Sequence, residues 1–356
     1  SAGVARGASG RSERAMSTGY AARILIYSHD TFGLGHLRRC RTLAQAIVSR
    51  YPNVSVLILS GSPIVGSFEF PTRVDFVRVP GVIKLRNGEY SSLSLHMDIS
   101  EVLALRASII RHTAMAFQPD VFIVDKEPLG LRGEIAETLQ DLRERGTRLV
   151  LGLRDVMDDP QLLADEWSRK NPVPALRDLY HQIWVYGLET ICSPLQGIEL
   201  PPSVEHKIVY TGYLGRELPA SARDEVRLPF DRPFILVTPG GGGDGIELVD
   251  RVLGAYELKG DDIPPALLVF GPFMPSRWRD KFRQRASVLD NVEVTTFDAR
   301  IEALMQRALG VVAMGGYNTF CEILSFDKPA LILPRRKPRM EQFIRASRAE
   351  ALGLIK

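Results

Sequence analysis

Three glycine-containing turns are the segments of this sequence best suited to holding an anion. Each follows a short apolar run and precedes a segment of helical periodicity: Gly33-Leu34-Gly35-His36, Gly240–Gly245 and Gly315-Gly316. Backbone N–H groups at such a turn, with the positive end of the helix dipole, can bind phosphate or a polar oxygen. In the second turn, four consecutive glycines also remove the Cβ atoms that would keep a phosphate from the amides. We therefore expect a phosphate at the second turn and a second anion at the third, which belongs to the strongest segment of the sequence. The alternatives are glycine used for geometry alone in the first turn and a merely flexible loop in the second.

Two common nucleotide motifs are absent from these turns. A dinucleotide fingerprint requires a third glycine and, about 20 residues further on, an acidic residue for the ribose, and the first turn has neither. The second turn lacks the Lys-Ser/Thr ending of a P-loop. Magnesium-dependent hydrolysis of a nucleoside triphosphate is therefore disfavoured.

His36 and Glu322 add side-chain chemistry beside two of the turns. His36 begins a predicted helix at the carboxyl edge of a sheet, where a histidine can act as a general base or a hydrogen-bond donor; a capping or structural role is the alternative. Asn318 or Thr319 can cap the helix after Gly315-Gly316. One turn further, the two carboxylate oxygens of Glu322 can accept from a pair of adjacent hydroxyls, as on a ribose.

Acidic residues after two predicted strands are less specific signals. Asp125, which precedes Lys126 and Glu127, ends a strand on the ligand edge, so it either lines a binding site or forms a buried structural pair. Three further acids follow the next strand: Asp155, Asp158 and Asp159. Acids in that position more often cap a helix or form a turn than bind a metal.

Two basic clusters have similarly open interpretations. One is a loop near the third glycine turn, containing Arg335, Arg336, Lys337 and Arg339. The other lies on the first predicted helix and contains Arg38, Arg39 and Arg41. Both clusters can be simple solvated surface; alternatively the loop lies near a ligand and the helix attracts anionic lipid.

Short runs of β-branched residues alternate with segments of helical periodicity along the chain, and the candidate residues above lie at the junctions between them. Such alternation predicts βαβ units around parallel sheets. In the first half we expect strands at 24–27, 56–59, 74–79, 121–124, 149–153, 183–186 and 208–210, and helices at 36–49, 100–116 and 134–145. Residues 80–99 are polar and aperiodic, so we expect a long surface loop there.

A second alternation follows a charged segment rich in proline. Its strands are expected at 234–237, 266–270, 292–295, 310–313 and 330–333, and its helices at 246–255, 278–287, 301–307, 318–326 and 341–352. The predicted fold class is therefore α/β, with two doubly wound domains. The predicted organisation is a disordered tail or appended remnant at 1–20, a first domain at 21–213, a linker at 214–232 and a second domain at 233–356.

Composition and charge argue against several classes of protein. A net charge of +3 gives no reason to expect nucleic acid as a partner. The three cysteines, Cys40, Cys192 and Cys321, have no metal-like spacing and fit a reducing compartment. No run approaches the roughly 18 apolar residues of a membrane span, and residues 1–20 lack the apolar core of a secretory signal. We expect a cytoplasmic protein without a bound metal or cofactor.

The paired α/β halves, the G-x-G-H turn and the spacing Gly315-Gly316-x-x-Thr319-x-x-Glu322 resemble the GT-B fold, specifically the family 28-like glycosyltransferases. These include the N-acetylglucosaminyltransferase that makes the lipid-linked peptidoglycan precursor. The segment GLGHLRRCRTLAQAI is also similar to a turn of the nucleotide-sugar hydrolase in pseudaminic acid synthesis. DVFIVDKEPLGLRGE looks like a bacterial group of predicted glycosyltransferases. The resemblance covers roughly residues 23–356.

The resemblance implies that a sugar is transferred, with inversion and without a metal, from a UDP-linked donor in the second domain to an unknown acceptor on the first. His36 would face the sugar carbon, and Asp125 and Glu127 would lie on the acceptor side. A lipid-linked acceptor and peripheral contact with the inner face of a membrane are further implications. The residues implied to bind the nucleotide-sugar are Gly35, Gly241, Gly242, Gly243, Gly315, Gly316, Asn318, Thr319, Glu322, Glu341 and Gln342.

Two departures from the family pattern leave alternatives open. Met314 stands where many relatives have His or Ser, and Gly33-Leu34-Gly35 is shorter than the transferase loop. A hydrolase in which His36 activates water and a non-enzymatic nucleotide-sugar-binding protein are the alternatives. Because relatives with this fold normally end in a helix that crosses back to the first domain, we also expect the natural chain to extend beyond Lys356.

Overall fold

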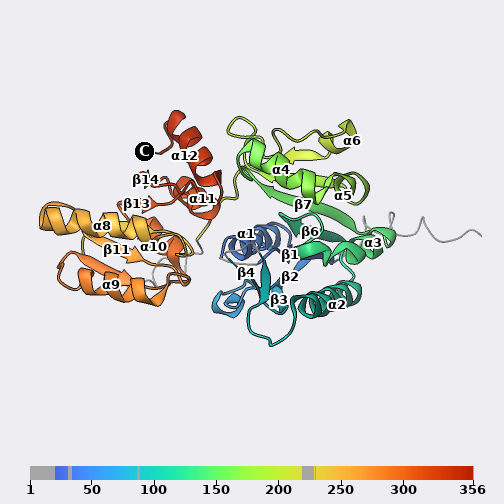
Figure 1. The fold of residues 1–356 in the computed structure, drawn as a ribbon, viewed down its shortest axis with the longest axis horizontal. Helices are drawn as coiled ribbons and strands as arrows, with labels where there is room; N and C mark the ends of the chain where they lie inside the picture. The colour runs from blue at the N-terminus through green and yellow to red at the C-terminus, as the bar shows by residue number, and fades with distance from the viewer. Residues whose placement is uncertain (1–20, 31–33, 86–88, 219–227, 229, 356) are drawn as a thin grey trace, which may run out of the picture.

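Two parallel sheets, each with helices on both faces, make up the computed structural model of this chain (Figure 1). The structure describes residues 21–30, 34–85, 89–218, 228 and 230–355. The predicted tail at 1–20 lies outside these residues, as do Gly33 and much of the predicted linker. The predicted α/β class with two Rossmann-like sheets is confirmed, whereas the predicted domain boundaries stay a prediction.

The first sheet has seven strands in the order β3-β2-β1-β6-β7-β8-β9. All neighbouring strands pair in parallel, as expected for runs of β-branched residues buried on both faces. The strands are β1 (Ala22–Ser28), β2 (Val54–Ser60), β3 (Val74–Arg78), β6 (Val121–Asp125), β7 (Arg148–Arg154), β8 (Gln182–Tyr186) and β9 (Ile208–Tyr210).

Successive side chains of β1 enter the cores on opposite faces of this sheet. Leu25 and Tyr27 pack among residues of α2 and α3, whereas Ile26 packs with residues of α1. The helices of the first half are α1 (Gly35–Arg50), α2 (Ile99–Phe117), α3 (Ala136–Glu144), α4 (Pro160–Lys170), α5 (Val173–Asp178) and α6 (Pro202–Glu205).

The second sheet has five parallel strands in the order β12-β11-β10-β13-β14. Residues of α8 and α9 pack on one face, and residues of α10, α11 and α12 on the other. The strands are β10 (Ile235–Thr238), β11 (Ala266–Val269), β12 (Val292–Thr295), β13 (Gly310–Ala313) and β14 (Ala330–Ile332). The helices are α8 (Ile246–Lys259), α9 (Ser276–Ala286), α10 (Ile301–Arg307), α11 (Tyr317–Ser325) and α12 (Glu341–Ala351).

The structure differs from the sequence prediction in two regions. The predicted loop at 80–99 contains an antiparallel hairpin of β4 (Val82–Lys84) and β5 (Tyr90–Ser92), anchored because Val82 is buried against Val102 of α2. The pattern also does not predict α4, α5 or α6. Each of these helices begins beside a proline, which is tolerated in a first turn but suggests a loop when read from sequence.

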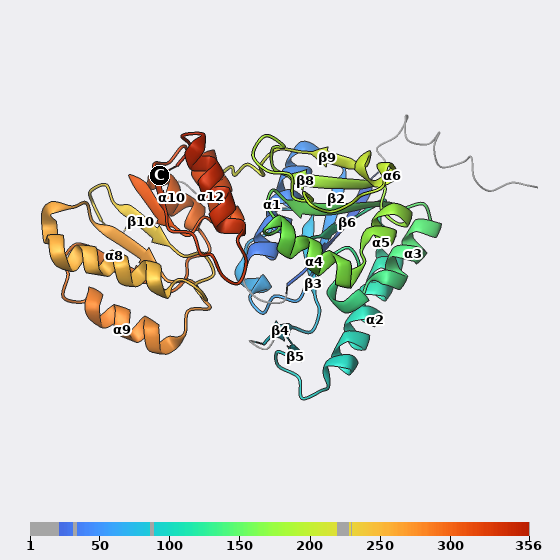
Figure 2. The same ribbon diagram turned by 45° about the horizontal axis from the view of Figure 1, so that its top comes forward.

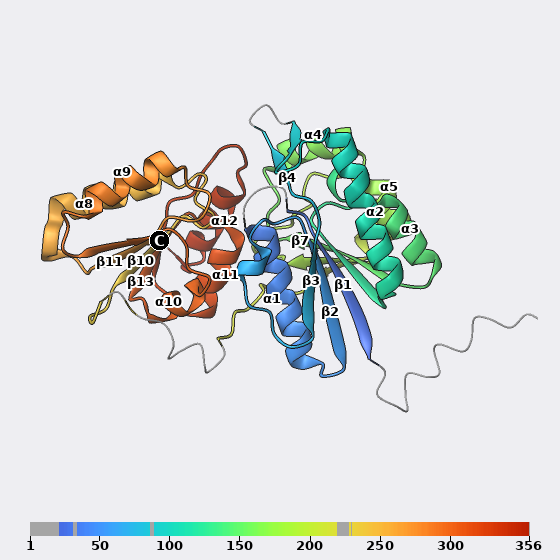
Figure 3. The same ribbon diagram turned by 90° about the horizontal axis from the view of Figure 1, so that it is seen from below.

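The predicted turns lie where ligands of open α/β sheets bind. β1 lies between β2 and β6, and β10 lies between β11 and β13, so the strand order reverses at both positions. Crevices form at the carboxyl ends of such strands. Figures 1 and 3 show α1 of the first domain beside α11 of the second, and Figure 2 shows α12 next to the first domain. None of the helices in the described part of the chain is long and apolar enough to cross a bilayer.

Candidate active site

His36, in the first turn of α1, forms a bonded group with Asp125 and Arg39. Nδ1 of His36 contacts Oδ2 of Asp125, the last residue of β6. Arg39 donates to both oxygens of the same carboxylate, over 2.7 Å from Nε and 2.8 Å from Nη2. Burial alone would raise the pKa of Asp125, but Arg39 and His36 hold it well below its usual value. Asp125 therefore combines the predicted structural pair with a contact that orients His36.

Burial sets the charge of the His36 ring. It lowers the pKa of His36 to about 4, although the attraction of Asp125 acts in the opposite direction. The ring is consequently neutral at pH 7. Because an ionised carboxylate can only accept a hydrogen bond, Nδ1 donates to Asp125 and the lone pair lies on Nε2. The His29 ring packs edge-on at 5.6 Å between centroids, and burial keeps its pKa well below the usual value as well.

The glycine turn after β10 packs tightly against the turn after β11. Gly240 and Gly242 have φ values of 79° and 90°. A Cβ on Gly242 would lie 2.3 Å from the carbonyl oxygen of Phe270. Gly241, whose carbonyl accepts from the N–H of Phe273, and Gly243 lie in the same turn. Glycine is therefore required at position 242 by the close packing of the two turns, whether or not a ligand binds there.

The glycine pair after β13 leads directly into α11. Gly315 has a φ of 75°, and a Cβ there would lie 2.8 Å from Cγ2 of Ile332. Gly316 is the residue before the first turn of α11, and no side chain within the described residues caps the helix. The prediction that Asn318 or Thr319 caps α11 is therefore wrong, since both lie inside the helix. Its first N–H groups are left without a side-chain acceptor, as an anion site requires.

Asn318 instead links the glycine turn before α11 to the glycine turn before α1, across the domain boundary. Its Nδ2 donates to the carbonyl of Gly35 over 2.9 Å, and its Oδ1 accepts from Nη2 of Arg216 over 2.8 Å. Thr319 is buried beside it. The start of α11 consequently touches the start of α1, which places Gly35 and His36 next to the predicted diphosphate site.

Glu322 is fully buried and paired with the first domain. Its Oε1 accepts from Arg38 of α1, whose Nη2 also reaches Glu302 over 3.2 Å. Nε of Arg216 lies 3.6 Å from the same oxygen of Glu322. Oε2 has no hydrogen-bond partner among the described residues. Burial raises the pKa of Glu322 to about 7, with Arg38 and Arg216 acting the other way. Arg38 occupies Oε1 of Glu322, so a ribose hydroxyl that binds through this oxygen has to displace it.

Glu341 and Gln342, at the start of α12, are linked to the glycine turn of β10 by Arg335. This arginine donates over 2.7 Å to Oε1 of Glu341 and ion-pairs with Asp244 of the turn. The N–H of Arg335 donates to Oε1 of Gln342 over 3.1 Å. Burial alone would raise the pKa of Glu341, but Arg154 and Arg335 hold it below its usual value. Both residues predicted to hold the donor sugar therefore lie beside the glycine turn.

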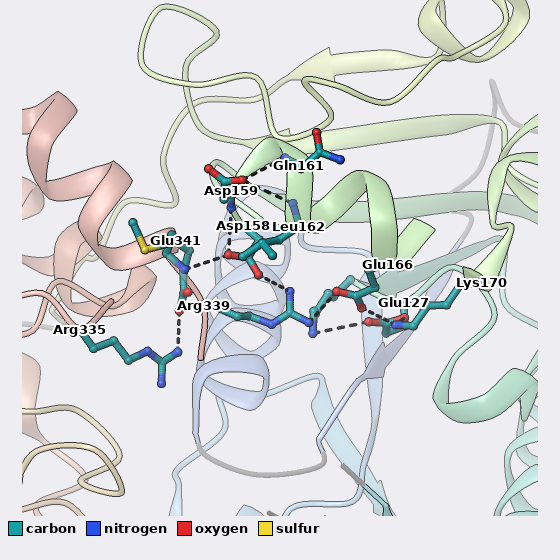
Figure 4. Close-up of polar contacts among 12 residues, drawn as sticks. Glu127, Asp158, Asp159, Gln161, Leu162, Glu166, Lys170, Arg335, Arg339 and Glu341 are labelled. Atoms are coloured by element: carbon teal, nitrogen blue, oxygen red, sulfur yellow. Dashed lines mark hydrogen bonds and ion pairs between the residues drawn. The ribbon is translucent and has the colours of Figure 1, made fainter. Parts of the chain in front are cut away.

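The acids after β7 serve the domain boundary and α4 (Figure 4). Asp159 accepts from the N–H groups of Gln161 and Leu162 and so caps α4, which confirms the capping interpretation. Asp158 accepts from the N–H of Met340 over 2.8 Å and from Arg339 over 3.2 Å. In the described part of the chain, no three His, Cys, Asp or Glu side chains come together as a metal site.

Asp155 and Arg345 form an ion pair between the domains that sequence reasoning missed. Arg345 donates to the two oxygens of Asp155 over 2.8 and 2.6 Å, and both side chains are 0% exposed. Arg345 also donates to the carbonyl of Gly315 over 3.0 Å, and the Tyr213 hydroxyl donates to Asp155 over 2.9 Å. No local signal connects two residues 190 positions apart.

The two basic clusters are largely bonded and not simply solvated surface. Arg38 and Arg39 are 11% and 3% exposed and bind the acids described above. Arg41 donates to the carbonyl of Glu69. In the loop, Arg339 binds Asp158 and also Glu166 of α4. The interpretation of both clusters as solvated surface is therefore wrong at Arg38, Arg39 and Arg339, because tertiary contacts supply acidic partners for these three side chains.

Comparison with known proteins identifies the relatives of this architecture. Residues 235–352 match the glycosyltransferase family 28 C-terminal domain. An uncharacterized glycosyltransferase of Methanosarcina mazei is 23% identical over 326 residues, which are 85% of this chain and 77% of the relative. A second, from Methanosarcina acetivorans, is 24% identical over 325 residues with the same shares.

Solved glycosyltransferase structures share the fold at low sequence identity. UGT2 of Phytolacca americana, complexed with UDP-2-fluoro-glucose and pterostilbene, has a TM-score of 0.61 and 16% identity, covering 94% of this chain and 85% of its own. MurG of Acinetobacter baumannii has a TM-score of 0.53 and 12% identity, covering 94% of this chain and 84% of its own. These likenesses establish the arrangement of two Rossmann-like domains.

Proposed function

Because residues 235–352 match the glycosyltransferase family 28 C-terminal domain and the chain has the GT-B fold, we propose that it is a family 28-like glycosyltransferase. In this proposal it transfers a sugar from a UDP-linked donor to an acceptor hydroxyl, with inversion and without a metal ion. The position of His36 is the observation that carries the proposal. A neutral imidazole, oriented by Asp125, lies where the first turn of α1 meets the start of α11.

His36 is the proposed general base. Nε2 accepts the proton of the acceptor hydroxyl as the oxygen attacks the sugar carbon from the face opposite the nucleotide. A single displacement of this kind inverts the configuration. Asp125 then stabilises the imidazolium that forms and keeps the ring in the productive tautomer.

The proposed donor site lies in the second domain. The N–H groups that begin α11 stabilise the leaving diphosphate, and the glycine turn at 241–243 supports it from β10. Glu322 receives the ribose hydroxyls after Arg38 has moved. Glu341 and Gln342 receive hydroxyls of the donor sugar; Oε2 of Glu341 is buried without a partner in the described chain. No step needs a metal, since amides and helix dipoles supply the positive potential.

We further propose a lipid-linked acceptor and contact with the inner face of a membrane. Leu93, Leu95 and Met97, between β5 and α2, are each about 40% exposed. Apolar side chains gathered on one loop are a common feature of surfaces that meet lipid. Vesicle flotation of the wild type against a Leu95→Ser/Met97→Ser variant tests this part separately.

A donor screen by thermal shift tests the proposed function. UDP-sugars should raise Tm more than GDP-, TDP- or CMP-sugars, and Glu322→Ala should remove most of the shift. His36→Ala should keep the shift but lose turnover, whereas His112→Ala, at an exposed site on α2, should keep both. The absence of a shift with any nucleotide-sugar would contradict the proposal.

The same assay separates the two alternatives. Free sugar released equally fast with and without an added acceptor would indicate a hydrolase, in which water takes the place of the acceptor hydroxyl at His36. Donor binding without turnover for any acceptor would indicate a binding protein.

A further inference from the structure

Arg154 is a cation at the domain boundary whose Nε has no hydrogen-bond partner in the described part of the chain. Arg154 is the last residue of β7, which pairs in parallel with β6. In this register Gly152 of β7 lies opposite Asp125 of β6. Lys126, which follows Asp125, donates its N–H to the carbonyl of Gly152 over 2.8 Å. Lys126 and Arg154 therefore leave neighbouring strands at the same edge as the His36–Asp125 pair. Nε of Arg154 is buried and has no hydrogen-bond partner among the residues that the structure describes.

The carboxylates at the rim of this region are already engaged (Figure 4). Glu127 pairs with Lys170 over 3.1 Å and with Lys126 over 3.5 Å. Glu166 accepts from Lys170 over 2.6 Å and from Arg339 over 2.9 Å. Asp158 accepts from Arg339 and from a backbone N–H. Each of these three acids thus has two donors, and none of them bonds Arg154. The fourth acid nearby is Glu341, which attracts Arg154: its Oε1 accepts from Arg335, and its Oε2, like Nε of Arg154, has no hydrogen-bond partner among the described residues.

Electrostatics agrees with an excess of positive charge at this edge. Burial lowers the pKa of Arg154 to about 10, against the attraction of Glu341 and with the repulsion of Arg39. Burial also lowers the pKa of Lys126 to about 8, with Arg339 and Arg154 contributing and Glu127 opposing. A buried cation in this position gains from an anion that accepts its N–H groups.

We propose that Arg154 and Lys126 bind a carboxylate or phosphate carried by the acceptor, beside the hydroxyl that His36 deprotonates. The inference rests on the proposed function, because the His36–Asp125 pair marks the reacting position. Both cations follow the strand ends that carry Asp125, so we assign the anion to the acceptor. Arg154 also faces the attraction of Glu341, a proposed donor-sugar residue, and the comparison of UDP-glucuronate with UDP-glucose below tests that alternative. The planar guanidinium fits either anion in a bidentate geometry.

Anion binding can be measured without knowing the acceptor. Inorganic phosphate is titrated calorimetrically in saturating UDP, which fills the predicted diphosphate site, into the wild type, Arg154→Gln, Lys126→Gln and Arg177→Gln. Arg177 pairs with Asp178 on an exposed helix and serves as the matched control. The first two variants should weaken phosphate binding about tenfold or more, as loss of a charge-assisted contact implies. Equal affinity in all four proteins would overturn the proposal.

Acceptor preference gives the second test. Matched acceptors that differ in charge, glucose 6-phosphate against glucose and 4-hydroxybenzoate against its methyl ester, are compared with each donor that binds. The charged member should have a KM about tenfold lower with the wild type, the difference should vanish in Arg154→Gln, and Arg154→Lys should restore part of it. If Arg154→Gln instead changes only the preference for UDP-glucuronate over UDP-glucose, the anion belongs to the donor and the assignment is wrong. If no nucleotide-sugar binds, the proposed function fails, while the phosphate titration still decides the role of Arg154.

Discussion

Arg38 should compete with the donor ribose for Glu322, so Arg38→Met is expected to tighten UDP binding. The Arg38 and Glu322 side chains are 11% and 1% exposed, so little solvent screens their contact. When Glu322 is ionised, above its pKa of about 7, a hydrogen bond between two charged groups in such a setting contributes about 1.5–3 kcal/mol. UDP must break this contact in the wild type but not in the variant. The Kd for UDP should therefore fall about ten- to a hundredfold.

Isothermal titration of UDP into both proteins measures this difference directly. Glu302→Gln is the matched control, because it removes the negative charge of the second partner of Arg38, at 3.2 Å, and leaves the Glu322 side chain in place. It should change the Kd much less, since the contact with Glu322 survives. A weaker or unchanged affinity in Arg38→Met would refute the reasoning: either Arg38 itself holds the nucleotide, or the ribose does not bind Glu322. Glu322→Ala, which should abolish most UDP binding, separates these two outcomes.

Four further expectations address the chemistry and the domain boundary. His36→Ala should lower kcat about 10²–10⁴-fold with calorimetric UDP affinity unchanged, and full activity would return His36 to a structural role. The pH profile of kcat/KM should fall on its acid side near pH 4 and not near pH 6.5. Burial lowers the pKa of His36, and only the neutral ring accepts a proton. A fall near pH 6.5 would contradict a buried His36. Asp155→Asn should reduce the free energy of unfolding in urea by about 3–5 kcal/mol, since Arg345 is left buried and unpaired, whereas Asp178→Asn at an exposed pair should cost less than about 1 kcal/mol. Turnover should survive EDTA, and a loss that magnesium reverses would contradict a metal-free mechanism.

Local pattern predicts most of the sheet architecture, because strands buried on both faces appear as continuous β-branched runs. The segments 292–295, 301–307 and 310–313 coincide with β12, α10 and β13. Prediction fails where local chemistry is ambiguous. Prolines at 160, 172 and 202 look like loop residues but stand at helix starts. The pairing of β4 with β5 is not predicted because its anchoring contact, between Val82 and Val102, is tertiary.

For the candidate site too, features set by neighbouring residues could be predicted from sequence, and contacts between distant residues could not. The three glycine turns could be located from sequence because strand, turn and helix are adjacent in the chain. The sequence correctly places Asp125 at the end of a strand, but its contact with His36 spans 89 positions and has no local signature. The partners of Glu322 and Asp155 lie further away still and come from the other domain. The roles assigned to these side chains in catalysis and donor binding stay predictions until the variants are measured.

The contacts between the domains differ in how much water reaches them, and this difference predicts how the molecule opens. The Arg339 and Glu166 side chains are 24% and 20% exposed, so separating them needs little rehydration and should become easier as salt increases. Asp155 and Arg345 are dry, so parting them would require hydrating two bare charges. When the domains separate, the ion pair of Arg339 with Glu166 should therefore break before the ion pair of Asp155 with Arg345. The domains would rotate about the Asp155–Arg345 contact. The contact of Arg339 with Glu166 should therefore open more readily as ionic strength rises, while the contact of Asp155 with Arg345 stays closed.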